Sequence, residues 1–171
     1  MKNKQTHQHT DQSQLKHQYR NPDILREADS ILSDLPETLI DSYLATRYQI
    51  WIDSALVTLK IGCPSAPLAA LMQMTSARNA VYVTACNPGS RIVPLDVNQL
   101  AMVRLYEKLA GCSNHIYQGA GIDPTGKWPA EESLLALDVD LPAARLIGKE
   151  FRQNAIVWID SAAMPRLVLL H

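Results

Sequence analysis

Cysteine is scarce and irregularly placed in this sequence, which argues against a secreted fold stapled by disulfides. The three cysteines, Cys63, Cys86 and Cys112, are an odd number and include no Cys-x-x-Cys pair. Small secreted domains usually carry an even set that pairs completely. The sequence also shows no positively charged segment followed by an apolar stretch at its start, as a secretory leader would. We therefore expect a protein of the reducing cytoplasm.

An excess of charge and a long apolar run are also missing. The formal net charge is only -1, and without a basic excess nucleic acid is disfavoured as the main partner. No apolar run reaches the roughly 20 residues that a membrane-spanning helix needs. The longest candidate, 61–74, is interrupted by Gly62, Pro64 and Pro67. We expect a soluble protein with no membrane segment.

The apolar residues that are present predict one domain behind a polar tail. They make up 47% of the 171 residues, which is enough for a core without disulfides. Residues 1–21 are mostly polar and bury too little to offset the entropy of ordering, so we expect a disordered tail. Its three histidines have no carboxylate or cysteine pattern beside them, and we predict no metal site. Residues 22–171 are then expected to form a single domain.

Apolar residues recur with helical spacing in four segments. The segments are 22–35, 34–47, 96–111 and 140–154. Asp96 and Asp140 stand at N-cap positions, and Gly111 is suited to close the third helix in the left-handed conformation. The side chains expected on the buried face of the third helix are Leu100, Val103, Leu105, Tyr106 and Leu109.

Strand-forming residues fill most of the remaining chain. The predicted strand regions are 48–61, 80–86, 115–118, 132–139, 155–159 and 166–170. The first region is either one bent strand or a hairpin, and residues 62–78 are left open between a short helix at 67–73 and a loop. The order of elements predicts an α+β fold with a mixed or antiparallel sheet of about six strands. Two helices pack on this sheet, and further helices precede it.

Several short motifs after residue 83 stand in one order. They are Thr84-Ala-Cys-Asn-Pro88 with Ser90, then Asn98, then Trp128 with Glu132-Ser133, and finally Phe151-Arg-Gln-Asn-Ala-Ile156. Over about residues 39–170 the chain resembles a bacterial family catalogued as a domain of unknown function, number 3293. The resemblance implies a bacterial source and a small domain that stands alone. It brings no activity with it, so no catalytic residue is carried over.

The turn after the strand at 80–86 is the main candidate for a ligand site. Ligands often bind at the edge of a sheet where strands end. Side chains of Asn87, Ser90 and Arg91 can hold a phosphate or carboxylate there, with Trp128 at the rim. The alternative is that Asn87 and Ser90 hydrogen-bond their own backbone and only shape the turn.

Two adjacent glutamates before the strand at 132–139 supply a candidate acid or base. Neighbouring residues of a strand point to opposite faces, so only one of Glu131 and Glu132 can enter a site. We assign the role to Glu132 as a general acid or base. The alternative is a charged start of the strand with Trp128 covering the core. A Cys86–His115 pair is a further possibility, weighed against a buried, inert cysteine.

These residues support two functional hypotheses. The first is a regulatory domain that binds a small molecule or a protein in a pocket rimmed by Asn87, Ser90, Arg91 and Trp128. The second is a small enzyme, a hydrolase or transferase, that acts on an anionic substrate and uses Glu132 as its acid or base. Neither hypothesis calls for a cofactor.

Overall fold

The computed structural model describes residues 21–26 and 35–170. The tail predicted at 1–21 lies outside the described residues, apart from Asn21. Along the described chain the elements are β1 (Ile24–Leu25), α2 (Glu37–Ala45), β2 (Arg47–Ile52), β3 (Ala55–Leu59), α3 (Ala66–Thr75), β4 (Ala80–Val83), η1 (Pro88–Ser90), α4 (Leu95–Ala110), β5 (Ile116–Ile122), β6 (Glu131–Leu137), α5 (Leu141–Glu150), β7 (Ala155–Ile159) and β8 (Pro165–Leu169).

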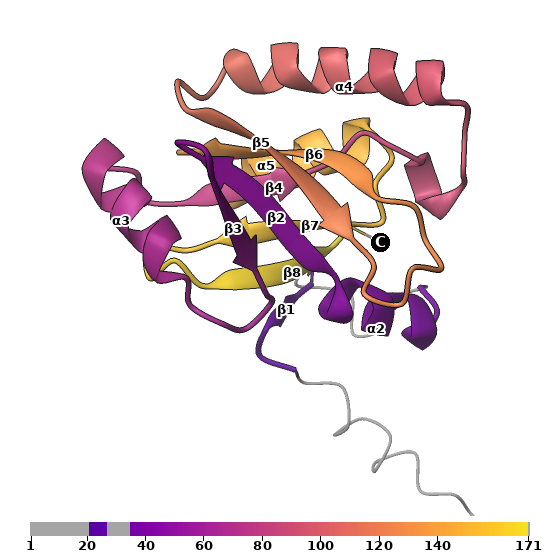
Figure 1. Ribbon diagram of the computed structural model, residues 1–171, viewed down its shortest axis with the longest axis horizontal. Helices are drawn as coiled ribbons and strands as arrows, with labels where there is room; N and C mark the ends of the chain where they lie inside the picture. The colour runs from indigo at the N-terminus through magenta and orange to yellow at the C-terminus, as the bar shows by residue number, and fades with distance from the viewer. Residues whose placement is uncertain (1–20, 27–34, 171) are drawn as a thin grey trace, which may run out of the picture.

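All eight described strands belong to one sheet in the order β1-β8-β7-β4-β6-β5-β2-β3 (Figure 1). Only the β1–β8 pair is parallel, and every other neighbouring pair is antiparallel. The predicted α+β class and mixed sheet are confirmed. The detail differs, because the described residues contain eight strands and four α-helices rather than about six strands and two packed helices.

The predicted helix at 22–35 is wrong at its start. Ile24 and Leu25 are extended and pair with Leu167 and Val168 of β8. Two apolar residues in a row fit a helix as well as a strand, and here pairing with a distant strand overrides the local pattern. Residues 27–34, the remainder of that prediction apart from its last residue, lie outside the described residues.

The two segments with alternative predictions, 48–61 and 62–78, adopt definite structures. Residues 48–61 form a hairpin, because Asp53 and Ser54 adopt positive φ angles of 47° and 73° and make the two-residue turn between β2 and β3. Residues 62–78 contain α3, whose first free N–H groups are partly satisfied by the Ser65 hydroxyl accepting from the Leu68 amide at 3.4 Å.

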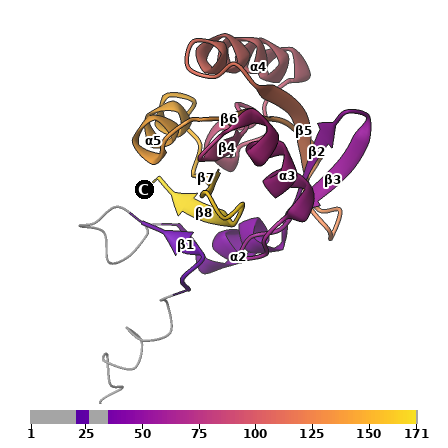
Figure 2. The ribbon, with the colours of Figure 1, turned by 90° about the vertical axis from the view of Figure 1, so that its left-hand side faces the viewer.

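Helices cover both faces of the sheet (Figure 2). On one face, α4 and α5 pack on alternate residues of the central strands β4 and β6, including Val83 and Leu134. On the other face, α3 packs on Tyr82 and Leu135. Helix α2 covers the end of this second face through Ile40, which contacts Leu167 and Leu169 of β8.

The predicted buried face of α4 is corrected in part. Leu105 and Leu109 are fully buried, but Leu100, Val103 and Tyr106 are more than half exposed. The helix is rotated so that Met102, Leu105 and Leu109 face the sheet, and the other apolar side chains lie on the neighbouring stripe.

The predicted helix ends are also corrected in part. Asp140 caps α5 as expected, its carboxylate accepting from the Ala143 amide at 2.8 Å. Pro94, and not Asp96, precedes the first turn of α4, and Gly111 is right-handed with a φ of -74°. Helix α5 ends at Glu150, before Asn154.

Candidate functional site

A pocket of about 480 Å³ lies between α2, the loop 123–130 and the end of the second sheet face that α2 covers. Its floor comes from β4, β6, β7 and β8, and its walls come from α2, β2, β5 and the turn at η1. The volume is within the range of pockets that hold small organic molecules. The aromatic residues of the lining are Tyr43, Tyr48, Tyr82 and Trp128.

One glycine of β5, Gly121, contributes to the hollow at this end of the sheet. Gly119 and Gly121 alternate on the face that carries the pocket, and they pair with Ser133 and Glu131 of β6. A Cβ atom on Gly119 would collide with the Gln49 carbonyl oxygen. A Cβ atom on Gly121 would meet only the Thr46 methyl group, at 3.9 Å, so the missing side chain leaves open space beside Glu131.

Glu131 is the carboxylate that enters the pocket. Its Oε1 atom accepts hydrogen bonds from Asn87 Nδ2 at 2.7 Å and from Trp128 Nε1 at 2.9 Å. Among the described residues, no group donates to its Oε2 atom. Burial raises the pKa of the Glu131 carboxyl above its ordinary value, and the bonds from Asn87 and Trp128 offset part of that rise.

Asn87 is fixed by the start of α4. Its backbone N–H donates to Asn98 Oδ1 at 2.9 Å, and its own Oδ1 accepts from Asn98 Nδ2 and the Val93 amide, both at 3.1 Å. Asn87 adopts the left-handed conformation with a φ of 46°, which asparagine tolerates better than most residues. It therefore shapes the turn and also points its amide nitrogen at Glu131.

The loop after β5 positions Trp128. The Asp123 carboxylate accepts from the backbone N–H groups of Thr125, Lys127 and Trp128 at 2.9 to 3.0 Å. These bonds, first of all that from Thr125, hold the pKa of Asp123 below its ordinary value. The loop is thus folded around an ionised carboxylate, and the indole N–H is presented to Glu131.

A hydroxyl cluster joins α2 to the turn at η1. The hydroxyls of Tyr43 and Ser90 are 2.8 Å apart, and Asn154 Nδ2 donates to both, at 3.2 and 3.0 Å. The Tyr48 hydroxyl donates to the Tyr43 carbonyl oxygen at 2.6 Å. Burial raises the pKa values of Tyr48 and Tyr82 well above the ordinary tyrosine value, so both side chains are neutral.

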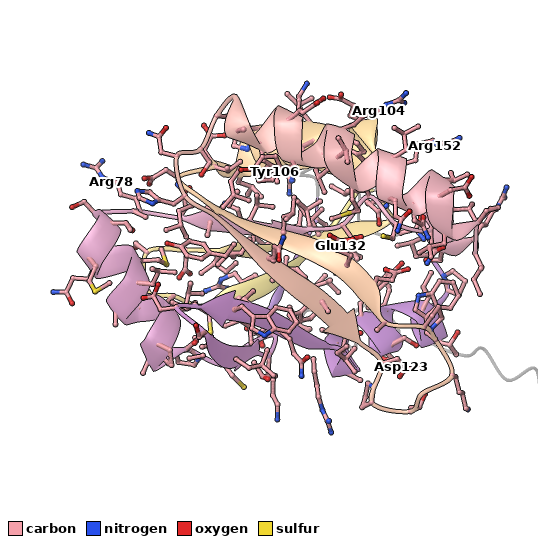
Figure 3. All side chains as sticks on the ribbon, turned by 45° about the horizontal axis from the view of Figure 1, so that its top comes forward. Arg78, Arg104, Tyr106, Asp123, Glu132 and Arg152 are labelled. Atoms are coloured by element: carbon pink, nitrogen blue, oxygen red, sulfur yellow. The ribbon has the colours of Figure 1, made fainter. Side chains whose placement is uncertain are left out.

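The structure brings together three of the five predicted site residues. Asn87, Ser90 and Trp128 line the pocket. Arg91 is exposed and does not line it. Glu132 is exposed and lies on the face of β6 that is turned away from the pocket and toward α4 (Figure 3). Asp123, which does line the pocket, lies in the loop after β5.

Sequence reasoning weighed both glutamates but chose Glu132 over Glu131, and it missed Tyr43, Tyr48 and Tyr82. The choice between Glu131 and Glu132 depends on the phase of β6, and the signal is weak because Leu134, Leu135 and Ala136 are all buried. Ser133 does provide a sequence signal for the face of β6 that lies toward the pocket. Ser133 shares a face with Glu131, so the polar alternation at 131 and 133 marks the pocket side.

The Cys86–His115 pair is not assembled. Cys86 Sγ lies 3.7 Å from the Glu132 carbonyl oxygen, near the start of β6. The His115 carbonyl accepts from the Leu137 amide, at the other end of β6. Burial raises the pKa of the Cys86 thiol, which disfavours the reactive thiolate.

The described ranges, 21–26 and 35–170, contain no group of three or more His, Cys, Asp or Glu side chains placed to bind a metal ion. No helix within them combines the length and apolarity needed to cross a membrane.

The fold and the pocket together define an α+β protein with an aromatic-walled, carboxylate-bearing cavity. Residues 83–156 match the family model described as "Protein of unknown function (DUF3293)", which confirms the resemblance over a narrower range than 39–170. The matched range includes Asn87, Ser90, Trp128 and Glu131 but not α2. No curated protein and no solved structure matches the chain.

Proposed function

We propose that this protein is a ligand-binding domain whose ligand is a small organic molecule held in the pocket under α2. One observation carries the proposal: a half-buried Glu131, fixed by Asn87 and Trp128, stands in a cavity whose walls are mostly aromatic and aliphatic. Ligand pockets typically combine apolar walls with a few convergent polar groups in this way.

The site supports binding because its polar groups are already positioned. Asn98 holds Asn87, and Asp123 holds the backbone of Trp128. A pre-organised site loses less conformational entropy when a ligand binds than a flexible one does. The pocket can therefore accept a ligand without first ordering these side chains.

A thermal-shift screen against metabolites and nucleotides tests the proposal, because a ligand that prefers the folded state raises its melting temperature. Gly121→Leu fills the space beside Glu131. Ala120→Leu is the matched control, since Ala120 is the neighbouring residue of β5 and does not line the pocket. We expect compounds that stabilise the native protein and Ala120→Leu but not Gly121→Leu. Hits that stabilise all three proteins equally, or no hits at all, would contradict the proposal.

A second candidate function is acid–base catalysis by Glu131. Burial raises the pKa of this carboxyl above its ordinary value, and Glu131 lines the pocket. A hydrolase or transferase would then use Glu131 in the role that we predicted for Glu132. Turnover should fall about 100-fold or more in Glu131→Gln. If turnover falls only in Glu132→Gln, the acid–base role belongs to the exposed Glu132 and not to Glu131.

The bacterial source, the cytoplasmic location and the regulatory role stay predictions from the sequence. A role in regulation fits a domain that binds a small molecule. It would be tested by whether a ligand found in the screen changes the set of proteins that co-purify with the full chain.

A further inference from the structure

The hydrogen-bond donors that line the pocket are mostly engaged within the protein. Four lining hydroxyls donate to main-chain carbonyl oxygens at 2.6 to 3.3 Å, those of Tyr48, Tyr82, Thr84 and Ser133. The side-chain amide of Gln153 donates to the Cys86 carbonyl oxygen at 3.1 Å. A ligand that brings only acceptors therefore finds few partners.

The pocket's main acceptor, the Glu131 carboxylate, is in contrast only partly engaged within the protein. Glu131 uses Oε1 for Asn87 and Trp128, and among the described residues nothing donates to Oε2. An ionised carboxylate has no proton to donate and accepts at both oxygens. The site is thus completed by a ligand that donates a hydrogen bond at this position.

The charges of the lining favour the same kind of ligand. Among the described lining residues Asp41, Asp123 and Glu131 are acidic, Lys127 is the one basic residue, and none is an arginine or histidine. Lys127 is exposed, and its backbone is tied to Asp123 in the outer loop. A cation near Glu131 would offset a charge that burial makes costly.

The walls suit the body of an organic cation. Tyr43, Tyr48 and Trp128 surround the space together with aliphatic side chains such as Val157. Aromatic rings attract cations as well as apolar groups. A compact inorganic cation would leave these walls uncovered, whereas an amine attached to an apolar group would cover them.

We propose that the ligand of this pocket is an organic amine, whose protonated nitrogen donates to Oε2 of Glu131 while its apolar part lies against the tyrosines and Trp128. This inference rests on the proposed binding function and adds the class of the ligand. It replaces the anionic substrate expected from the sequence, for which Asn87, Ser90 and Arg91 were the predicted contacts.

Three matched probes measured by isothermal titration calorimetry test the ligand class. They are 2-phenylethylamine, 2-phenylethanol and 3-phenylpropanoate, which share a phenyl group and differ in charge. We expect the amine to bind about tenfold or more tightly than the alcohol, because hydrogen bonds to charged groups are the stronger ones. The carboxylate should bind most weakly.

Variants locate the origin of the preference. Glu131→Gln keeps an oxygen for Asn87 and Trp128 but places an N–H donor where Oε2 was, so the preference for the amine should disappear or reverse. Glu132→Gln removes the same charge from the opposite face and should retain the preference. Melting temperatures of both variants confirm that they fold.

The outcomes separate the two proposals. If the alcohol or the carboxylate binds best in a way that Gly121→Leu abolishes, the binding function stands and the amine inference fails. If amine preference survives Glu131→Gln, or if none of the probes binds, the amine inference also fails. If amine binding survives Gly121→Leu, the amine lies outside the pocket, and that result counts against both proposals.

Discussion

The two faces of the sheet are covered by helices in different ways. Under α4 and α5 the central strands present Val81, Val83, Leu134 and Ala136, and the helices fill the space above them. On the other face the α3 half is filled in the same manner, but the half beneath α2 contains a pocket. The same strands thus build a dry core on one side and a cavity on the other.

Strand β6 shows the origin of the difference residue by residue. Its residues alternate between the faces, so Glu131 and Ser133 point to the pocket while Leu134 points to α4. The neighbouring strand β5 places Gly121 opposite Glu131, where the missing side chain leaves open space, and Gly119 opposite Ser133, where the Gln49 carbonyl already fills the space. The hollow face of the sheet is the one that carries the small and polar residues of the alternation, and the filled face carries the apolar ones.

The largest expected effect comes from breaking the filled face. Leu105 is 0% exposed and Leu100 is 55% exposed, although both lie on α4. Leu105→Ala should lower the free energy of unfolding by about 2–5 kcal/mol, because it leaves a cavity in a packed core. Leu100→Ala is the matched control and should change it by less than about 0.5 kcal/mol. Urea unfolding measures both, and equal losses would contradict the assigned orientation of α4.

A smaller effect distinguishes the two glycines of β5. Gly119→Ala should destabilise the protein by about 1–3 kcal/mol, because the new methyl group collides with the Gln49 carbonyl and crowds Tyr82. Gly121→Ala places its methyl group in open space and should be nearly neutral. Thermal unfolding of the two variants compares them directly. A larger loss at Gly121 would show that the space beside Glu131 is not free.

Much of this arrangement follows from local patterns in the sequence. The apolar run that ends at Cys86 predicted the central strand β4, and Asp140 predicted the start of α5. The turn at 87–90 was found as a candidate site because its polar residues directly follow a buried strand. These features depend on residues close together in the chain, so periodicity and capping rules can predict them.

The remainder depends on contacts between distant segments. Nothing local shows that Ile24 pairs with β8, or that Tyr43 of α2 meets Ser90 and Asn154. Gly119 lies within β5, beyond the predicted strand region 115–118, and the close approach of the Gln49 carbonyl leaves no room for a side chain there. The choice of Glu131 over Glu132 likewise depends on which face of β6 lies toward the pocket, and the alternation of Glu131 with Ser133 is the one weak signal for it in the sequence.

The smallest expected effect is a pH dependence of the free energy of unfolding that arises only on the pocket face of the sheet. The pKa of Glu131 is raised in the folded protein above the ordinary value of 4.5. Its contribution to stability is therefore fully present below pH 4.5 and is lost as pH rises through the folded pKa. Glu131→Gln has no such titration, so the stability of the native protein relative to this variant should fall over that range. Urea unfolding at a series of pH values measures the difference. Glu132→Gln carries the same charge change on the exposed face, and a matching pH dependence there would mean that burial in the pocket is not the cause.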